Sequence, residues 1–229
     1  MKKTLLIVLF ITGFCFGQTY ELAEEFYSNG FPKVIKTYKV SKGKIEIVKR
    51  INWHFNGQKE KVMTYKDGER DGKWTRWYEN GQKREEGAYK DGKREGIWTV
   101  FSDGEKKYSE VTYKDGGKEG LETYWYMNGQ KSNEITYKDG NYDGKNTYWY
   151  ENGQKKSELN YKDGKKDGLY TGWWENGQKS YEMTFKEGYL DGKWTGWYEN
   201  NGQKEREEIY KDGDSISELW WNEDGSVKE

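Results

Sequence analysis

Apolar and polar residues alternate in short stretches along most of the chain, and glycines separate the stretches. Aromatic and β-branched residues recur through Lys73–Glu79, which predicts a strand. Asn80-Gly81 follows and predicts a type I′ hairpin turn, because that turn needs positive φ at both central residues. Gln82–Lys90 is then expected to form the returning strand. Asp91–Gly96 predicts a longer, glycine-punctuated connection to the next hairpin.

This pattern repeats with a fixed period. The glycines that close the second half of each repeat recur at one constant interval, at positions 72, 96, 120, 144, 168 and 192. A fixed period indicates a repeat array, in which each repeat buries its apolar face against its neighbours. We therefore expect an all-β protein, an elongated antiparallel sheet of stacked β-hairpin repeats of about 24 residues. A helix is disfavoured, because glycines recur at short intervals throughout the repeats.

Successive side chains of a strand point to opposite faces of its sheet, which sorts the repeat into two faces. One face gathers Trp74, Tyr78, Gly87 and Tyr89, and in other repeats it gathers tyrosine with Ile135 or Leu159; we expect it to be the main core. The other face carries tryptophan, threonine and glutamate, and we expect it to be amphipathic.

The two ends of the array depart from the repeat. Residues 18–50 and 214–229 predict N-terminal and C-terminal caps of a single repeat domain spanning 18–229. Within the array, a residue is missing before the turn at Phe101–Gly104 and one is gained after it. Asn200-Asn201-Gly202 carries one extra residue, and both slips predict bulges or altered loops.

Residues 1–17 have the organisation of a secretory signal peptide. Lys2-Lys3 precede an apolar run from Leu5 to Phe16, and small residues precede Gln18. The run is short for a membrane span, although an uncleaved anchor is the alternative. We expect export to the periplasm, cell surface or medium after cleavage near Gly17.

Composition narrows the chemistry further. Cys15 is the only cysteine and lies in the expected leader, so disulfides and thiolate sites are not expected in the mature chain. The 39 basic and 40 acidic residues nearly balance, which gives no electrostatic footprint for nucleic acid. Aromatic residues make up 17% of the chain, so the core is expected to consist mostly of tryptophan and tyrosine.

No catalytic residue, metal site or cofactor is predicted. His54 is the only histidine and is expected to have a structural or surface role. Asp139–Gly144 matches the opening of an EF-hand loop, but Tyr150 stands where the bidentate glutamate should be. One group of glutamates recurs once per repeat and is expected to pair with threonine or lysine across strands rather than to catalyse: Glu86, Glu134, Glu158, Glu182 and Glu207.

A column of tryptophans is the best candidate for a binding surface. It comprises Trp53, Trp77, Trp125, Trp149, Trp173 and Trp197. These rings could pack against strand neighbours and lysine stems, or they could form an exposed apolar stripe of the kind that marks an interface.

The repeat resembles the bacterial variant of the MORN repeat. The similarity covers roughly residues 27–225 and rests on strings such as Tyr150-Glu-Asn-Gly153-Gln-Lys155 and Tyr161-Lys-Asp-Gly164. The Gly-x-x-x-Gly step, as at Gly68 and Gly72, is the part shared with ordinary MORN repeats. The resemblance implies stacked β-hairpins in a scaffolding, partner-binding or membrane-contacting role, and bacterial variants are often labelled antitoxin components of toxin–antitoxin pairs.

Three functions remain open at this point. The first is an exported, non-enzymatic repeat protein that binds another protein or builds a scaffold. The second is a module that binds cell-wall polysaccharide or another carbohydrate, as choline-binding repeats do with similar hairpins. Thr171-Gly-Trp173 and Thr195-Gly-Trp197 alone reproduce the closing motif of those repeats. The third is an immunity-like partner that neutralises a toxin.

Overall fold

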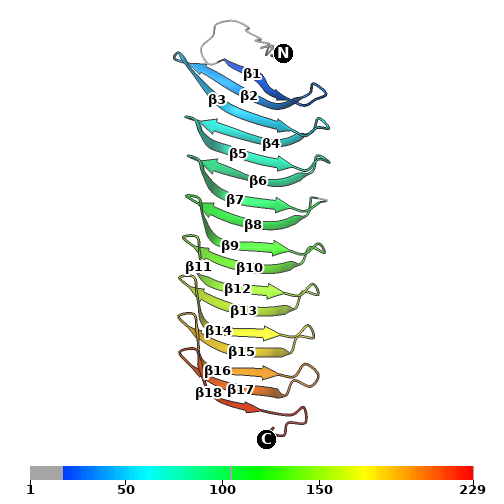
Figure 1. The fold of residues 1–229 in the computed structure, drawn as a ribbon, viewed down its shortest axis with the longest axis vertical. Helices are drawn as coiled ribbons and strands as arrows, with labels where there is room; N and C mark the ends of the chain where they lie inside the picture. Colours follow the sequence, from blue (N-terminus) through cyan, green and yellow to red (C-terminus); the bar gives the residue numbers. More distant parts are fainter. Residues whose placement is uncertain (1–17, 104, 229) are drawn as a thin grey trace. The chain divides into compact units, whose positions relative to one another are not determined.

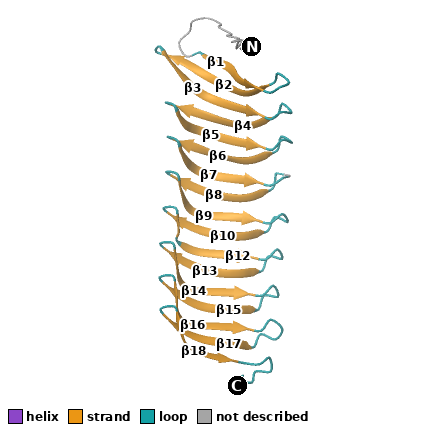
Figure 2. Cartoon of the chain, viewed as in Figure 1, coloured by secondary structure: helices purple, strands orange, loops and turns teal. Residues whose placement is uncertain are grey.

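The computed structural model describes residues 18–103 and 105–228, and the expected leader at 1–17 lies outside this range. The described chain contains strands, turns and loops and no helix (Figures 1 and 2). The all-β fold of antiparallel hairpin repeats is therefore confirmed. The strands are β1 (Thr19–Phe26), β2 (Pro32–Ser41), β3 (Lys44–Trp53), β4 (Lys59–Lys66), β5 (Glu69–Trp77), β6 (Lys83–Lys90), β7 (Lys93–Phe101), β8 (Lys107–Lys114), β9 (Gly117–Trp125), β10 (Lys131–Lys138), β11 (Asn141–Tyr142), β12 (Gly144–Trp149), β13 (Lys155–Lys162), β14 (Lys165–Trp173), β15 (Lys179–Lys186), β16 (Tyr189–Trp197), β17 (Lys204–Lys211) and β18 (Asp214–Trp220).

The strands fall into two compact units, which are described separately. The first unit extends to Lys106 and includes Tyr113–Gly116, and the second comprises Lys107–Thr112 and the chain from Gly117 onward. In the first unit, each strand from β1 to β7 pairs antiparallel with the next. In the second unit, β9, β10, β12 and the strands from β13 to β18 do the same, and β11 pairs with β10.

The two turns of each repeat exchange the roles that the sequence predicted. At Asp91-Gly92 both residues have positive φ, 47° and 77°, and Lys90 pairs with Lys93, so this is the two-residue hairpin turn. At Asn80-Gly81 only the glycine has positive φ, and Trp77 pairs with Lys83 across a longer loop. The predicted type I′ turn at Asn80-Gly81 and the predicted long connection at Asp91–Gly96 are both wrong. Asn-Gly instead ends a loop of the bulged type that also needs one left-handed residue.

The period glycines lie inside strands or, in the case of Gly144, at the start of one, rather than in loops. Gly72 has φ of 90° in the middle of β5, and the register shifts opposite it between Met63 and Tyr65. Its positive φ marks a bulge, a position that glycine adopts without strain. A side chain at Gly72 would also lie 2.7 Å from the Thr64 hydroxyl. The glycine that recurs at a fixed interval therefore corresponds to a bulge that recurs with the repeat.

The frame slip at Phe101 involves no insertion. Phe101 ends β7 as Trp77 ends β5 one period earlier, and Lys107 begins β8 as Lys83 begins β6. Glu105, with φ of 61°, occupies the left-handed position that Gly81 holds in the preceding loop. The prediction of a missing and a gained residue is therefore wrong. At Asn200-Asn201 the extra residue is real, because Tyr198 N donates to Gln203 O and lengthens that loop by one residue.

The predicted core face is the buried one. Met63, Trp74 and Trp98 in the first unit, and Ile135 and Leu159 in the second, are all buried. Large and small residues alternate across its centre, since Trp74 pairs with Gly87 and the Trp98 ring lies over the same glycine. The opposite face of each unit also has buried threonines, at positions 75 and 99 in the first unit and at positions 123, 147, 171 and 195 in the second.

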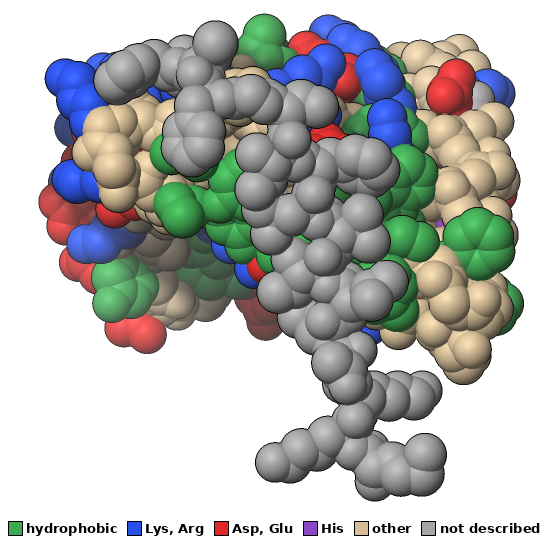
Figure 3. All heavy atoms as spheres, turned by 90° about the horizontal axis from the view of Figure 1, so that it is seen from above, with side chains coloured by type: hydrophobic (Ala, Val, Ile, Leu, Met, Phe, Trp, Pro, Cys, Tyr) green, Lys and Arg blue, Asp and Glu red, His purple; other side chains and the backbone are tan. Residues whose placement is uncertain are grey.

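Charged side chains of both signs lie next to one another at the β1 end of the molecule (Figure 3). The described residues include no helix of the length and apolarity needed to cross a membrane.

Candidate binding surface

Each predicted tryptophan of the column is the last residue of a strand. Trp53 and Trp77 end β3 and β5 in the first unit. The other four, Trp125, Trp149, Trp173 and Trp197, end β9, β12, β14 and β16 in the second unit. All six are half-buried. In each unit, we call the face that carries these rings and the buried threonines the tryptophan face.

Lysines cover part of the rings in the second unit. The Lys155 ammonium lies 5.7 Å from the centre of the Trp173 ring, and Lys179 lies 5.6 Å from that of Trp197. Lys107 lies in the same way over Trp125, at 5.8 Å. A cation at this distance is attracted to the face of an aromatic ring. The column is therefore partly packed, and each covered ring keeps an accessible portion.

The same lysines hold the repeated glutamates. Lys155 Nζ lies 2.7 Å from Glu158 Oε2, and Lys179 Nζ lies 2.5 Å from Glu182 Oε2. In the sheet register, Glu158 lies between Thr147 and Thr171 on the neighbouring strands. The five glutamates named from the sequence all pair with threonine and form an ion pair with the lysine at the start of the same strand. Their predicted role as cross-strand partners is confirmed.

Two of these carboxyl groups have lowered pKa values. Burial alone would raise the pKa of Glu158, but hydrogen bonds from Lys145 and Lys155 outweigh it and lower the pKa. Hydrogen bonds from Lys193 and Lys204 lower the pKa of Glu207. Both carboxylates therefore stay ionised, each bound by two lysines.

In most repeats, the residue after one tryptophan forms a side-chain hydrogen bond with the backbone carbonyl of the tryptophan one repeat further on. Tyr126 Oη donates to Trp149 O at 2.6 Å, and Tyr150 Oη donates to Trp173 O at 2.8 Å. Each bond joins a loop to the strand end one repeat further on. His54 occupies this tyrosine position in the first unit, and its Nε2 lies 3.1 Å from Trp77 O. The structure thus gives the only histidine a structural role.

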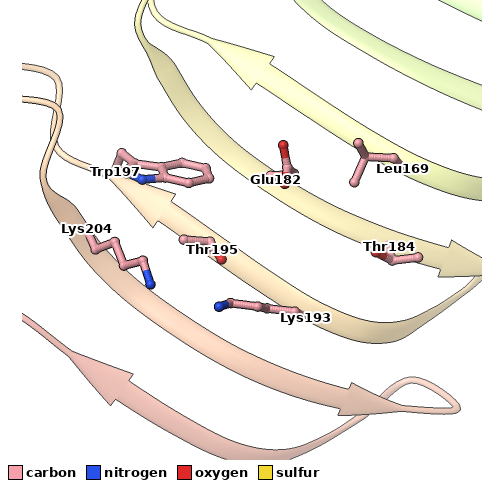
Figure 4. A pocket seen from close by; sticks show the side chains of 7 residues that line it. All are labelled: Leu169, Glu182, Thr184, Lys193, Thr195, Trp197 and Lys204. Atoms are coloured by element: carbon pink, nitrogen blue, oxygen red, sulfur yellow. The ribbon is translucent and has the colours of Figure 1, made fainter.

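A hollow of about 220 Å³ opens on the tryptophan face of the second unit. Figure 4 shows Glu182 between the Trp197 ring and Leu169, with Thr195 next to Trp197. The remaining lining residues are Thr184, Lys193 and Lys204. The hollow combines an aromatic ring, an aliphatic side chain and a carboxylate.

The EF-hand-like segment does not form a cation site. Asp139 and Gly140 form a two-residue turn, and Asn141 continues directly into β11. The Asp143 carboxylate accepts a hydrogen bond from the backbone of Asp163 at 3.2 Å. No group of three or more histidine, cysteine, aspartate or glutamate residues in the described chain is arranged to hold a metal ion.

Sequence reasoning missed two members of the column and two buried carboxylates. Phe101 and Trp221 follow Trp77 and Trp197 by one period, so the period itself could have identified them. Lys204 lies over the Trp221 ring at 5.5 Å, as Lys179 lies over Trp197. The carboxylates are Glu122 and Glu208, 3% and 2% exposed on the core face.

Both buried carboxylates contact cationic and hydroxyl groups on the core face. Lys118 Nζ lies 2.7 Å from Glu122, and Tyr124 Oη donates to it at 2.9 Å. Arg206 and Tyr210 Oη contact Glu208. Burial, followed by the hydrogen bond to Glu122, raises the pKa of Tyr124. These clusters replace apolar packing and leave the carboxylates inaccessible to a ligand.

Four segments of the chain match a model of a known repeat family. The family model described as "MORN repeat variant" matches residues 70–91, 118–139, 142–163 and 166–187. These four segments, which make up less than half of the chain, are similar to the MORN repeat variant, and the loops at Phe101–Glu105 and Asn200–Gly202 lie outside them. MORN repeats are commonly binding modules for proteins or membranes and are generally non-enzymatic.

No curated protein matches the chain. Among solved structures, one described as "Crystal Structure of TarM" matches with 12% identity and a TM-score of 0.29. The match covers 49% of this chain and 21% of that one, so the chain spans about a fifth of its length.

Proposed function

We propose that this protein is an exported, non-enzymatic repeat protein that binds another protein, or builds a scaffold, through its tryptophan face. The observation that carries the proposal is the regular row of half-buried rings at strand ends, which recurs once per period beside exposed aliphatic side chains such as Leu121 and Leu169. Aromatic rings with a polar surround are typical of the centre of a protein interface.

The chemistry of this face favours binding over catalysis. Its carboxylates recur in every repeat and are held by lysine, whereas an active site needs one distinct constellation with a free acid, base or nucleophile. The generally non-enzymatic character of MORN repeats agrees with this.

A carbohydrate ligand is the second candidate, and the hollow favours it. An aromatic ring next to a carboxylate and a hydroxyl, as in Trp197, Glu182 and Thr195, could stack on a sugar and bind its hydroxyl groups. No comparison supports the third function, a toxin-neutralising partner.

A pull-down from envelope extract separates the two candidates. The bait is residues 18–229, the chain expected after cleavage. Bound material is eluted from the immobilised bait with salt and then with sugar. Discrete proteins released by salt would support the proposal, because screening weakens charged protein interfaces. Retention on wall polysaccharide alone would replace the proposal with the carbohydrate function.

Export has its own test. The proposal expects the mature protein to begin near Gln18 and to be found outside the cytoplasm. Mass spectrometry of the protein from cell fractions measures both, and an intact N-terminus in the cytoplasmic fraction would contradict export.

A further inference from the structure

The glutamates of the tryptophan face in the second unit differ in the number of lysines that bind them. Glu158 binds Lys145 and Lys155, and Glu207 binds Lys193 and Lys204. Among the described residues, Glu182 has a single ion pair, with Lys179. Its side chain is 31% exposed and lines the hollow, and the printed ion pair is with its Oε2 oxygen.

The missing second lysine is explained by a single position of the repeat. Glu182 follows Glu158 by one period, and Leu169 follows Lys145 by the same interval. Leu169 is 47% exposed and lines the hollow next to Glu182. An aliphatic side chain therefore occupies the place from which a lysine reaches the carboxylate in the neighbouring repeats.

The lysines that line the hollow do not neutralise Glu182. Lys193 Nζ and Lys204 Nζ lie 2.6 and 2.9 Å from Glu207 Oε2. In Figure 4 both side chains run below Thr195 and Trp197, and their nitrogens point toward one another and away from Glu182. Trp197 and Leu169 flank the carboxylate with apolar surface.

We propose that this hollow receives a lysine or arginine side chain of a protein partner, with its hydrocarbon stem on Leu169 and Trp197 and its cationic head on Glu182. The chain itself supplies the model for this contact, because Lys145 and Lys193 make the equivalent contacts with Glu158 and Glu207. Long cationic side chains bind in this way, with the stem on apolar surface and the charge on a carboxylate. The inference rests on the proposed function, which it refines by giving the chemistry of the partner.

The repeat positions of this site recur two repeats earlier, and we infer a second site of the same kind there. Leu121 is 47% exposed and occupies the same repeat position as Leu169. The glutamate of this site is Glu134, which has one ion pair in the described chain, with Lys131, and its ring is Trp149. Four strand spacings separate Leu121 on β9 from Leu169 on β14, a distance of about 19 Å. A partner that binds both sites therefore presents two cationic side chains at about this separation.

This spacing defines the probe. The probe is a synthetic peptide. A single exposed ion pair contributes at most about 1 kcal/mol, so the peptide carries two lysines that can bind both sites at once. In an extended threonine–serine peptide, lysines about six residues apart are separated by about 20 Å. Control peptides carry norleucine or glutamate at both positions. Binding to the full chain is followed by the indole NMR signals of Trp149 and Trp197.

We expect the lysine peptide to shift both signals and to bind about tenfold more tightly than the norleucine peptide. Leu169→Lys should fold, because lysine occupies the equivalent positions 145 and 193. It should weaken peptide binding about tenfold and abolish the shift at Trp197, while the shift at Trp149 remains. Lys193→Leu should create a new site at Glu207 and add a shift at Trp221.

Equal binding of the lysine and norleucine peptides would overturn the proposal, as would the absence of binding. Peptide binding by Leu169→Lys at the parent affinity, with the shift at Trp197 retained, would also overturn it. Preference for the glutamate peptide would reassign the hollow to an anion held by Lys193 and Lys204. The pull-down from envelope extract tests the proposed function independently of these peptides. A partner whose capture requires the tryptophans but is unaffected by Leu169→Lys would keep that function and reject the cationic side chain.

Discussion

At the scale of single residues, glycine allows large rings to lie flat on the core face. Gly87 has ordinary strand geometry, but a Cβ atom there would lie 2.4 Å from the Trp98 ring. Gly172 is covered in the same way by Tyr181, at 2.3 Å. Since Trp98 is 2% exposed and contacts Trp74 and Tyr89, it has little room to move. These glycines therefore permit the close approach of a ring rather than a positive φ.

Gly87→Ala should therefore destabilise the protein. The new methyl group forces the Trp98 ring away from its packed position, and we expect a loss of about 1–3 kcal/mol in the free energy of unfolding. Urea denaturation measures it. The matched control is the same change in a Trp98→Leu background, where the loss should be clearly smaller if the ring causes it. An equal loss in both backgrounds would contradict this explanation.

At the scale of elements, the hairpins are joined by side chains that reach from one loop to the next strand end. Tyr150 Oη donates to Trp173 O, and Asn152 Nδ2 donates to Glu175 O at 3.1 Å. Asn152 Oδ1 also accepts from Gln154 N within its own loop at 2.9 Å. The asparagine therefore organises its loop and binds the next one, which gives the Asn-Gly pair a role other than that of a type I′ turn.

Tyr150→Phe tests this connection. It removes the hydroxyl and leaves Trp173 O without its donor, so we expect a loss of about 1 kcal/mol in the free energy of unfolding. Tyr148→Phe is the matched control, because Tyr148 is 38% exposed and its hydroxyl forms no hydrogen bond within the described chain. The control should unfold like the parent protein. Equal effects of the two changes would show that the tyrosine-to-carbonyl bond contributes nothing.

The sequence predicted some features of the elements and missed others, for physical reasons. The fixed period and the alternation of aromatic with polar residues were sufficient to predict the hairpin repeats and the recurrence of the six tryptophans at one position of the repeat. Turn types were not predictable in this way, because Asn-Gly suits both a two-residue turn and the last positions of a longer loop. The register decides between them, and at Asn80-Gly81 it pairs Trp77 with Lys83.

The candidate site was predictable only in part. Its rings and carboxylates follow from spacing, and the pairing of glutamate with threonine was foreseen. The hollow was not, because it depends on the directions in which Lys193 and Lys204 extend and on the replacement of one lysine by Leu169. The available signal was a repeat-by-repeat comparison of that position, which is lysine in some repeats and aliphatic in others.

At the scale of the whole molecule, many tyrosines ionise only with difficulty. Burial is the main cause that raises the pKa of Tyr148, Tyr161 and Tyr181 above the ordinary value of 10.0, and a hydrogen bond with Tyr170 adds to it for Tyr181. Burial and a hydrogen bond to Glu24 raise the pKa of Tyr38 to about 12. A raised pKa in the folded state means that folding favours the protonated phenol.

The protein should consequently lose stability in alkali. The contribution of these tyrosines is fully present below pH of about 10, the unfolded pKa, and is lost as pH rises through the higher folded values. Thermal unfolding measured by circular dichroism between neutral and strongly alkaline pH should show a fall that begins near pH of about 10. Phenolate absorbance should rise together with unfolding. Ionisation of all tyrosines in the folded protein, without loss of stability, would contradict this linkage.

The most direct test of the binding role of the tryptophan face is the double variant Trp149→Ala with Trp173→Ala, measured for partner capture and for thermal unfolding. Both rings are half-buried at strand ends, and Tyr126 and Tyr150 bind their backbone carbonyls rather than their side chains. We predict that capture is abolished while the fold remains, with only a modest decrease in melting temperature. Loss of the folded state would assign the two rings to packing, and undiminished capture by a folded variant would exclude them from the binding surface.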